Sequence, residues 1–171
     1  MNASKFHLES IRSGLAVIAA SLLLVACASY DGRGLKPGRA KLTEVEALMG
    51  KAAMRWQNAD GSLQLAYPHG PAGFDTYMVT IGADGRLQGI SNALAPKNLA
   101  RIAPGMTEEQ VLRIAGPTTC RSAYFKARDE LVWDWRYLDD LRNPAHFFVL
   151  FDATKGTVRS TMSMASPEVC S

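Results

Sequence analysis

The chain has 171 residues, of which 47% are hydrophobic and 20% are charged, and its formal net charge is +3. This excess of basic over acidic residues is too small to indicate nucleic acid binding, so that class of function is excluded. The length suits one domain or two small ones.

Residues 1–26 have the pattern of a bacterial lipoprotein signal peptide. Lys5 and Arg12 precede the uncharged run GLAVIAASLLLV, which is shorter than the roughly 20 apolar residues that a spanning helix needs. The following Leu-Val-Ala-Cys ends at Cys27 and resembles the lipobox, in which the cysteine thiol takes a diacylglycerol and the preceding peptide is cleaved. The alternative is an ordinary signal peptide cut near Ala28, with an incidental cysteine.

The residues after Cys27 indicate whether a lipid anchor on it would lie in the inner or the outer membrane. Ala28 and Ser29 follow it, and neither is the aspartate that marks retention in the inner membrane. The lipobox resemblance therefore implies an anchor in the inner leaflet of the outer membrane, with the protein facing the periplasm. Residues 27–34 are expected to be a linker. The basic stretch RGLKPGRAK, residues 33–41, is either solvated or attracted to anionic headgroups.

Two further cysteines, Cys120 and Cys170, form an even pair in an oxidising compartment. We expect them to form a disulfide, which would close a loop of about 50 residues and stabilise the fold by roughly 4 kcal/mol in the chain-entropy model. The bond would tie the C-terminus back to the domain. The alternative is that both thiols are free.

Two segments of the mature chain repeat in the same order. LKPGRAKLTEVEALMGKA, residues 35–52, matches IAPGMTEEQVLRIAGPT, residues 102–118. TYMVTIGADGRL, residues 76–87, matches HFFVLFDATKGTV, residues 146–158. Two matches in one order indicate a tandem duplication. The expected units are a degenerate first repeat over 35–95 and a second repeat over 96–171.

Each repeat predicts helix followed by strands. In the second, we expect a short helix over 96–103 and a helix opened by a Thr107–Gln110 capping box and stopped after Ala115 by Gly116. The strands are CRSAYFK, LVWDWRYL, HFFVLFD and VRSTMSM. The first repeat predicts a helix near 41–49, with Thr43 and Glu46 as a possible capping box, and the strands AAMRWQ, LQLAY, DTYMVTI and RLQGIS. The predicted fold class is α+β: a tandem repeat of a short helix or helix pair packed on a four-stranded antiparallel sheet.

The segments PGMTEEQVLRIAGPT, WDWRYL and FFVLFDATKGTV resemble the BamE/SmpA-OmlA family. The resemblance covers about 99–162 well and the first repeat weakly. It implies a small accessory lipoprotein of the outer-membrane β-barrel assembly machinery. Family members have one such unit, whereas this chain has two. A duplicated helix-and-sheet unit is also similar to the β-lactamase inhibitor protein, which grips its target with a concave sheet.

Candidate catalytic groups are sparse, and we expect no enzyme activity, cofactor or metal. His69 and His146 fall in different repeats, whereas zinc needs three or four clustered ligands. A set of His146 with Cys120 and Cys170 is conceivable, but the disulfide is favoured. Nothing resembles a nucleophile elbow. The chain is therefore expected to bind protein, either as an assembly factor for outer-membrane proteins or as a periplasmic inhibitor or sensor that holds an enzyme or cell-wall component.

Strand alternation locates a candidate binding face. Trp133, Trp135 and Tyr137 share one side of their strand and are expected to form the core with Phe147, Val149 and Phe151. The other side carries apolar residues where an exposed sheet would be polar, so either the first repeat or a partner should cover it. If the repeats lie side by side as a curved eight-stranded surface, the partner-binding residues are Asp134, Arg136, Phe148 and Leu150, with Met78 and Thr80 from the first repeat. The alternative is that this surface is only core.

Overall fold

The computed structural model describes residues 31–70, 73–118, 120 and 122–165. The signal segment, Cys27 and Cys170 lie outside the described residues, so the expectations about them stay predictions. Within the described part of the chain, no helix is long and apolar enough to cross a membrane.

The described part of the first half contains one helix and a four-stranded antiparallel sheet with the strand order β1-β2-β3-β4. These elements are α2 (Leu42–Met49), β1 (Met54–Gln57), β2 (Leu63–Pro68), β3 (Thr76–Ile81) and β4 (Leu87–Asn92). The second half contains two helices, a 3-10 turn and another four-stranded antiparallel sheet, in the order β5-β6-β7-β8. Its elements are α3 (Pro96–Leu99), α4 (Glu108–Ala115), β5 (Ala123–Phe125), η1 (Lys126–Arg128), β6 (Glu130–Leu138), β7 (Pro144–Asp152) and β8 (Thr157–Ala165). The predicted α+β class with two four-stranded antiparallel sheets is confirmed.

The helix starts show how far local sequence rules reach. The expected capping box of α4 is present: Gln110 N donates to Thr107 Oγ1 at 3.3 Å, and Thr107 N donates to Gln110 Oε1 at 2.8 Å. The capping box suggested for α2, Thr43 with Glu46, is wrong. The residue that precedes the first turn of the helix is Lys41, two positions before Thr43. Lys41 pairs as an extended residue with Arg86, so the helix starts directly after it, and Lys41 N donates to Glu44 Oε2 at 2.8 Å.

The first sheet is covered on both faces. On one face, Val45 and Met49 of α2 pack into a buried cluster with residues of all three strands β2, β3 and β4: Leu65, Tyr67, Val79, Ile81 and Leu87. On the opposite face, a second cluster joins Ala66, Met78 and Ala93, with Met54 and Trp56 packed against it. This second face meets the other half of the chain, since Gln64 Nε2 donates to the carbonyl oxygen of Arg113 on α4 at 2.6 Å.

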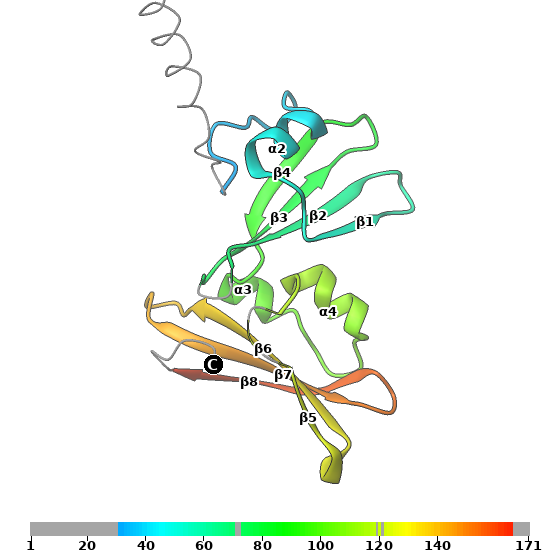
Figure 1. Cartoon of the computed structure of the whole chain (residues 1–171), viewed down its shortest axis with the longest axis vertical. Coiled ribbons are helices and arrows are strands. Elements are labelled where there is room, and N and C mark those ends of the chain that lie inside the picture. Colours follow the sequence, from blue (N-terminus) through cyan, green and yellow to red (C-terminus); the bar gives the residue numbers. More distant parts are fainter. Residues whose placement is uncertain (1–30, 71–72, 119, 121, 166–171) are drawn as a thin grey trace, which may run out of the picture.

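The second sheet is packed on one face by α3 and α4. The buried cluster there joins Leu99 of α3 and Val111 and Ala115 of α4 to strand residues that include Trp135, Phe147, Val149 and Phe151. The resulting order of layers is α2, first sheet, α3 with α4, second sheet (Figure 1). The sheets are therefore stacked with helices between them, and the expected side-by-side eight-stranded surface is wrong. The apolar face of the first sheet drives this arrangement, because α4 removes it from water.

Candidate protein-binding surface

The face of the second sheet opposite α3 and α4, here called the outer face, holds four of the six predicted binding residues. The strand register pairs Asp134 with Phe148 and Arg136 with His146, and Val132 pairs with Leu150. On β8, Met162 pairs with Phe148 and Met164 with His146. Directly paired residues of an antiparallel sheet project from the same side, so these side chains share one face.

The division into inner and outer residues is confirmed. The predicted core side chains Trp135, Tyr137, Phe147, Val149 and Phe151 are all buried against the helices, and Trp133 packs against the same cluster. Trp135 is fully buried, and its indole Nε1 donates to the carbonyl oxygens of Gly116 and Pro117 at 3.3 and 3.0 Å. The aromatic set thus fixes the end of α4 on the second sheet.

Arg136 is on the outer face but is not exposed. Its relative exposure is 4%, and its guanidinium carbon lies 4.3 Å from the ring centroid of Phe74, in the loop before β3. A cation stacked this closely over an aromatic ring is attracted by the ring's negative face. The expectation that Arg136 offers an open binding contact is therefore corrected: the side chain fastens the first half of the chain to the second.

Met78 and Thr80 do not join the outer face. They alternate with Val79 on β3 and project toward α4, and Met78 is only 7% exposed within the cluster it forms with Ala66. The helices α3 and α4 separate them from Phe148 and Leu150. The prediction that the first repeat contributes these two residues to one continuous surface is wrong, because the sheets are stacked.

A polar cluster lies at one end of the outer face. His146 Nδ1 lies 2.9 Å from each carboxylate oxygen of Asp134, and Cys120 Sγ lies 4.0 Å from the same nitrogen. Burial raises the pKa of Asp134 above its ordinary value, while the hydrogen bond with His146 acts in the opposite direction. His146 itself is 7% exposed.

Three potential metal-ligand atoms come together in this cluster, all within 4.8 Å of one another. Metal-binding cysteine acts as a thiolate, however, whereas Cys120 is one of the two residues for which we expect a disulfide. With that disulfide, the cluster would be a buried polar pair of Asp134 and His146 beside the bond. Pairing of Cys120 with Cys170 stays a prediction, since Cys170 lies outside the described residues.

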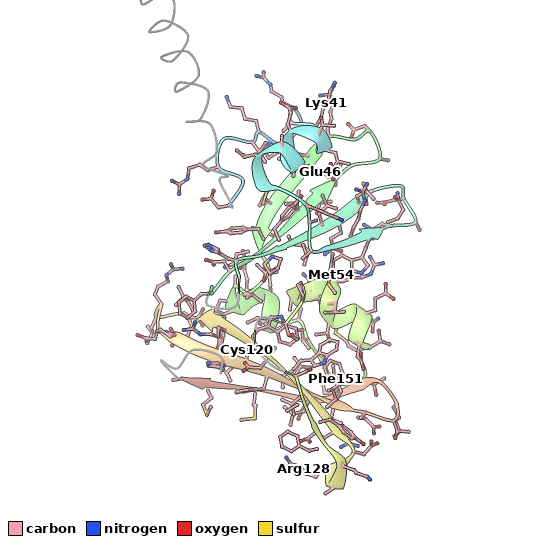
Figure 2. The ribbon with its side chains drawn as sticks, viewed as in Figure 1. Lys41, Glu46, Met54, Cys120, Arg128 and Phe151 are labelled. Carbon is pink, nitrogen blue, oxygen red and sulfur yellow. The ribbon has the colours of Figure 1, made fainter. Side chains whose placement is uncertain are left out.

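Sequence reasoning missed the most exposed apolar side chains of this surface. Met162 and Met164 on β8 are each 50% exposed, and Phe125 on β5 is 43% exposed, while Phe148 and Leu150 between them are half-buried. The alternation in VRSTMSM would have placed both methionines on the outer face once β8 was paired with β7. Figure 2 shows that this surface and the N-terminal end of α2 lie far apart: Arg128, at the tip of the β5–β6 hairpin, and Lys41 mark opposite ends of the molecule.

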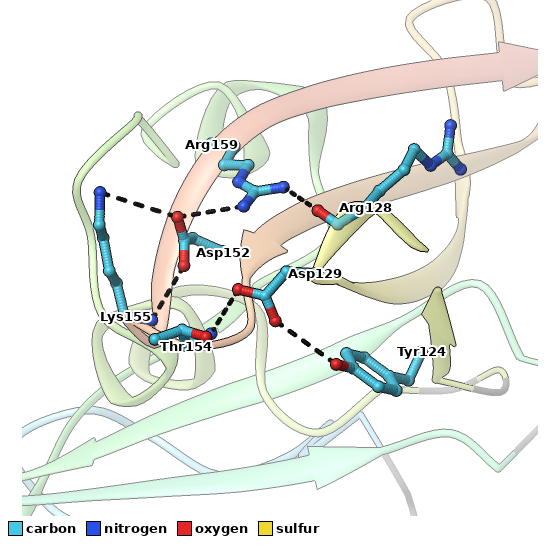
Figure 3. A network of polar contacts seen from close by, with 7 residues as sticks. All are labelled: Tyr124, Arg128, Asp129, Asp152, Thr154, Lys155 and Arg159. Carbon is cyan, nitrogen blue, oxygen red and sulfur yellow. Dashed lines mark hydrogen bonds and ion pairs between the residues drawn. The ribbon is translucent and has the colours of Figure 1, made fainter. Parts of the chain in front are cut away.

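A network of polar contacts holds the β5–β6 hairpin in place (Figure 3). Asp129, in a left-handed conformation with φ 47°, accepts a hydrogen bond from Thr154 N at 3.2 Å and one from the Tyr124 hydroxyl at 3.4 Å. Arg159 Nη1 donates to the Arg128 carbonyl oxygen at 2.8 Å. Because this network ties the hairpin to the β7–β8 turn, Phe125 is presented from a fixed position.

The same network includes a carboxylate with a depressed pKa. Asp152 accepts a hydrogen bond from Lys155 N at 2.9 Å and pairs with Arg159 Nη2 at 3.1 Å. The backbone hydrogen bond from Lys155, followed by the contact with Arg159, lowers the pKa of Asp152. The turn therefore keeps its negative charge at neutral pH and stays bonded to β8.

No protein-family model and no curated protein matches the chain. Among solved structures, it is similar to a DUF4309 family protein, YjgB, from Bacillus subtilis subsp. subtilis str. 168, at 18% identity and a TM-score of 0.30, over 78% of this chain and 84% of that one. It is also similar to an extracellular protein containing an SCP domain from Bacillus anthracis str. Ames, at 12% identity and a TM-score of 0.27, over 74% of this chain and 43% of that one.

Proposed function

We propose that this protein is a lipid-anchored, non-enzymatic accessory of the outer membrane that binds another envelope protein through the outer face of its second sheet. The observation that carries the proposal is the exposure of Met162 and Met164 on a sheet face that no helix or sheet of the described residues covers. A large apolar patch on a soluble surface is typical of an interaction site. Methionine side chains are flexible and polarisable, which suits such a contact.

The proposal includes the duplication and the likeness to the BamE/SmpA-OmlA family, and matching backbone details of the two halves support it. Gly38 N donates to Leu87 O at 2.8 Å, and Gly105 N donates to Val158 O at 2.9 Å. Both β3–β4 and β7–β8 have a register shift, after Thr80 and after Leu150. Such irregularities are treated as designed features, and their recurrence at corresponding places favours a common origin.

The place where the described chain begins fits an anchored protein that presents this face to the periplasm. The described chain begins at Asp31, four residues after Cys27, and it runs beside α2 at one end of the stack of layers (Figure 1). The outer face lies at the opposite end. A lipid on Cys27 would therefore leave the outer face free to meet a partner away from the membrane.

One observation favours the alternative function, a periplasmic inhibitor or sensor. The β5–β6 hairpin projects from the body of the second sheet (Figure 1), and its Tyr124 and Phe125 are both exposed. A rigid projection with aromatic side chains can fill a cleft of an enzyme, since aromatic anchors in pockets dominate many interfaces.

Co-purification from detergent-solubilised membranes tests the proposed function. We expect the wild-type protein to retain envelope proteins, with barrel-assembly components among them, and Met162→Glu to lose them. The matched control is Leu141→Glu, since Leu141 is an 81% exposed apolar residue in the β6–β7 turn. A single soluble or wall-linked partner would support the inhibitor or sensor instead. Capture that is equal in both variants would contradict the assignment of the outer face.

The anchor needs its own test. Cys27→Ser should block lipid modification and leave uncleaved or mislocalised precursor, which metabolic labelling with a fatty-acid analogue would detect. A Cys27→Ser protein labelled as strongly as the wild type would exclude lipidation at this residue.

A further inference from the structure

The two sheets have four edge strands, and three of them are protected against pairing with another chain. β1 is four residues long and carries the exposed Arg55. β4 is partly covered, because Leu87 exchanges hydrogen bonds with the segment 38–40. β5 has three residues and leads into a turn with Lys126 and Arg128. Short edges, charged side chains and covering segments are the usual ways in which proteins keep sheet edges from pairing.

The edge of β8 lacks this protection over most of its length. The strand has nine residues, and among the described residues only the segment 105–107, next to α4, pairs with its far side, at Thr157 and Val158. The one charged residue is Arg159, at the register shift near the start. Beyond it, Ser160–Ala165 contains no charge and no proline, and five of these six residues are exposed.

The chemistry of this edge specifies its occupant. In an antiparallel pair, alternate residues of β8 direct their N–H and C=O groups away from β7, so these groups form a ready row of donors and acceptors. Another extended backbone satisfies such a row, as in recognition by strand addition. Met162 and Met164 flank the row on the outer face, where they would lie against alternate side chains of the added strand.

We infer that residues 160–165 of β8 are a docking edge for an extended segment of another protein, one with apolar side chains at alternate positions, which adds to the second sheet as a fifth strand. This inference rests on the proposed function and names the binding mode. Main-chain hydrogen bonds supply affinity for many sequences, while the two methionines select segments that are apolar on one side.

Binding of a labelled model strand to the full chain in detergent tests the inference. The probe is the peptide Lys-Val-Thr-Val-Thr-Val-Thr-Glu, compared with the same peptide N-methylated on its Val and Thr amides, which cannot donate to a ladder. We expect the methylated peptide to bind at least about tenfold more weakly, since several net hydrogen bonds are lost. Hydrogen exchange of the amides in β8 should slow with the unmodified peptide, while exchange in β1 should not change.

Charge variants provide the matched control. Met162→Lys with Met164→Lys should weaken binding at least about tenfold, whereas Ala83→Lys with Leu141→Lys adds the same charge at exposed turn residues away from the edge and should leave binding unchanged. Four results would overturn the inference: no binding at millimolar peptide, equal binding of the methylated peptide, protection at β1 or β5 in place of β8, or self-association of the chain through β8. The proposed function has a separate test: it fails if no envelope protein co-purifies with the chain, and this result does not depend on whether the peptide binds.

Discussion

The two sheets have the same number of strands and the same strand order, yet they are used differently. The first lies between α2 and α4, and both of its faces carry buried clusters. Among the described residues, helices cover only one face of the second sheet, the face that meets α3 and α4, and its other face combines the buried Arg136 and His146 with the exposed Met162 and Met164. Stacking the two halves buries both faces of the first sheet and leaves part of the outer face of the second sheet exposed. Position in the stack therefore decides which sheet keeps an exposed face.

The largest expected effect comes from the core that supports the terminal sheet. Trp135→Ala should lower the free energy of unfolding by about 3–5 kcal/mol, because it removes a fully buried ring and two hydrogen bonds to the end of α4. Trp56 is half-buried between the first sheet and α4, so Trp56→Ala should lower the free energy of unfolding by less than half as much as Trp135→Ala. Urea unfolding of both variants makes the comparison, and equal losses would contradict it.

The expected disulfide between Cys120 and Cys170 should stabilise the second half of the chain, which contains both cysteines. Cys120→Ser is expected to lower the free energy of unfolding by about 2–4 kcal/mol, since the bond would restrict the unfolded chain. Wild type measured in a dithiol reductant should unfold at the same urea concentration as the variant. Non-reducing mass spectrometry should find the peptides of Cys120 and Cys170 linked, and detection of two free thiols would exclude the bond.

Two glycines, each directly after a helix, compare the open end of α2 with the end of α4 that contacts the first sheet. Gly50 ends α2 at φ 81° with open space around it, whereas Gly116 ends α4 at φ 76° with Thr76 Cγ2 only 2.7 Å from where a Cβ would lie. Both glycines combine a positive φ with an extended ψ, a conformation that almost only glycine adopts, so alanine at either position has a backbone penalty of about 1–3 kcal/mol. Gly116→Ala adds overpacking against the first sheet and should cost about 1–3 kcal/mol more by thermal or urea unfolding. Equal losses of unfolding free energy in Gly50→Ala and Gly116→Ala would mean that the end of α4 is not closely packed against the first sheet.

The smallest effect is a pH dependence located at the outer face. Burial raises the pKa of Asp134, so the folded protein binds a proton at this group more readily than the unfolded chain does. Its stabilising contribution is therefore complete below the ordinary aspartate pKa of 3.8 and is lost as the pH rises through the raised value. Asp134→Asn should remove this loss, so the stability of the variant relative to wild type should increase with pH in unfolding measurements from about pH 3 to 5. If the stability of Asp134→Asn relative to wild type falls with pH over that range, the pKa of Asp134 is lowered by folding and not raised.

Local patterns in the sequence predicted much of the fold. The four strands of each half, the Thr107–Gln110 capping box and the alternation that puts Trp135 on the inner side of β6 and Asp134 on its outer side depend on neighbours in the chain. The expected helix near 41–49 agrees with α2, but its capping box was assigned to the wrong residues, because Lys41 is held by a distant residue, Arg86.

The candidate site depended on contacts that no local pattern encodes. Arg136 is polar and lies on the outer face, but the ring of Phe74 from the other half covers it. Met78 is removed from solvent because α4 packs over its sheet. The pattern assigned these residues to the correct side of their strands, while the stacking of the two halves decided which of them remain exposed; that the outer face binds a partner stays a prediction.

Site-specific photo-crosslinking in native membranes tests most directly the claim that the terminal sheet binds and the inner sheet does not. A photoreactive residue is placed at Met162 on the outer face, at Thr80 on the face of the first sheet that meets α4, or at the exposed Leu141 in the β6–β7 turn. We predict crosslinks to another envelope protein from position 162 and none from positions 80 and 141. Crosslinks from position 80, or an equal yield from all three positions, would contradict the account.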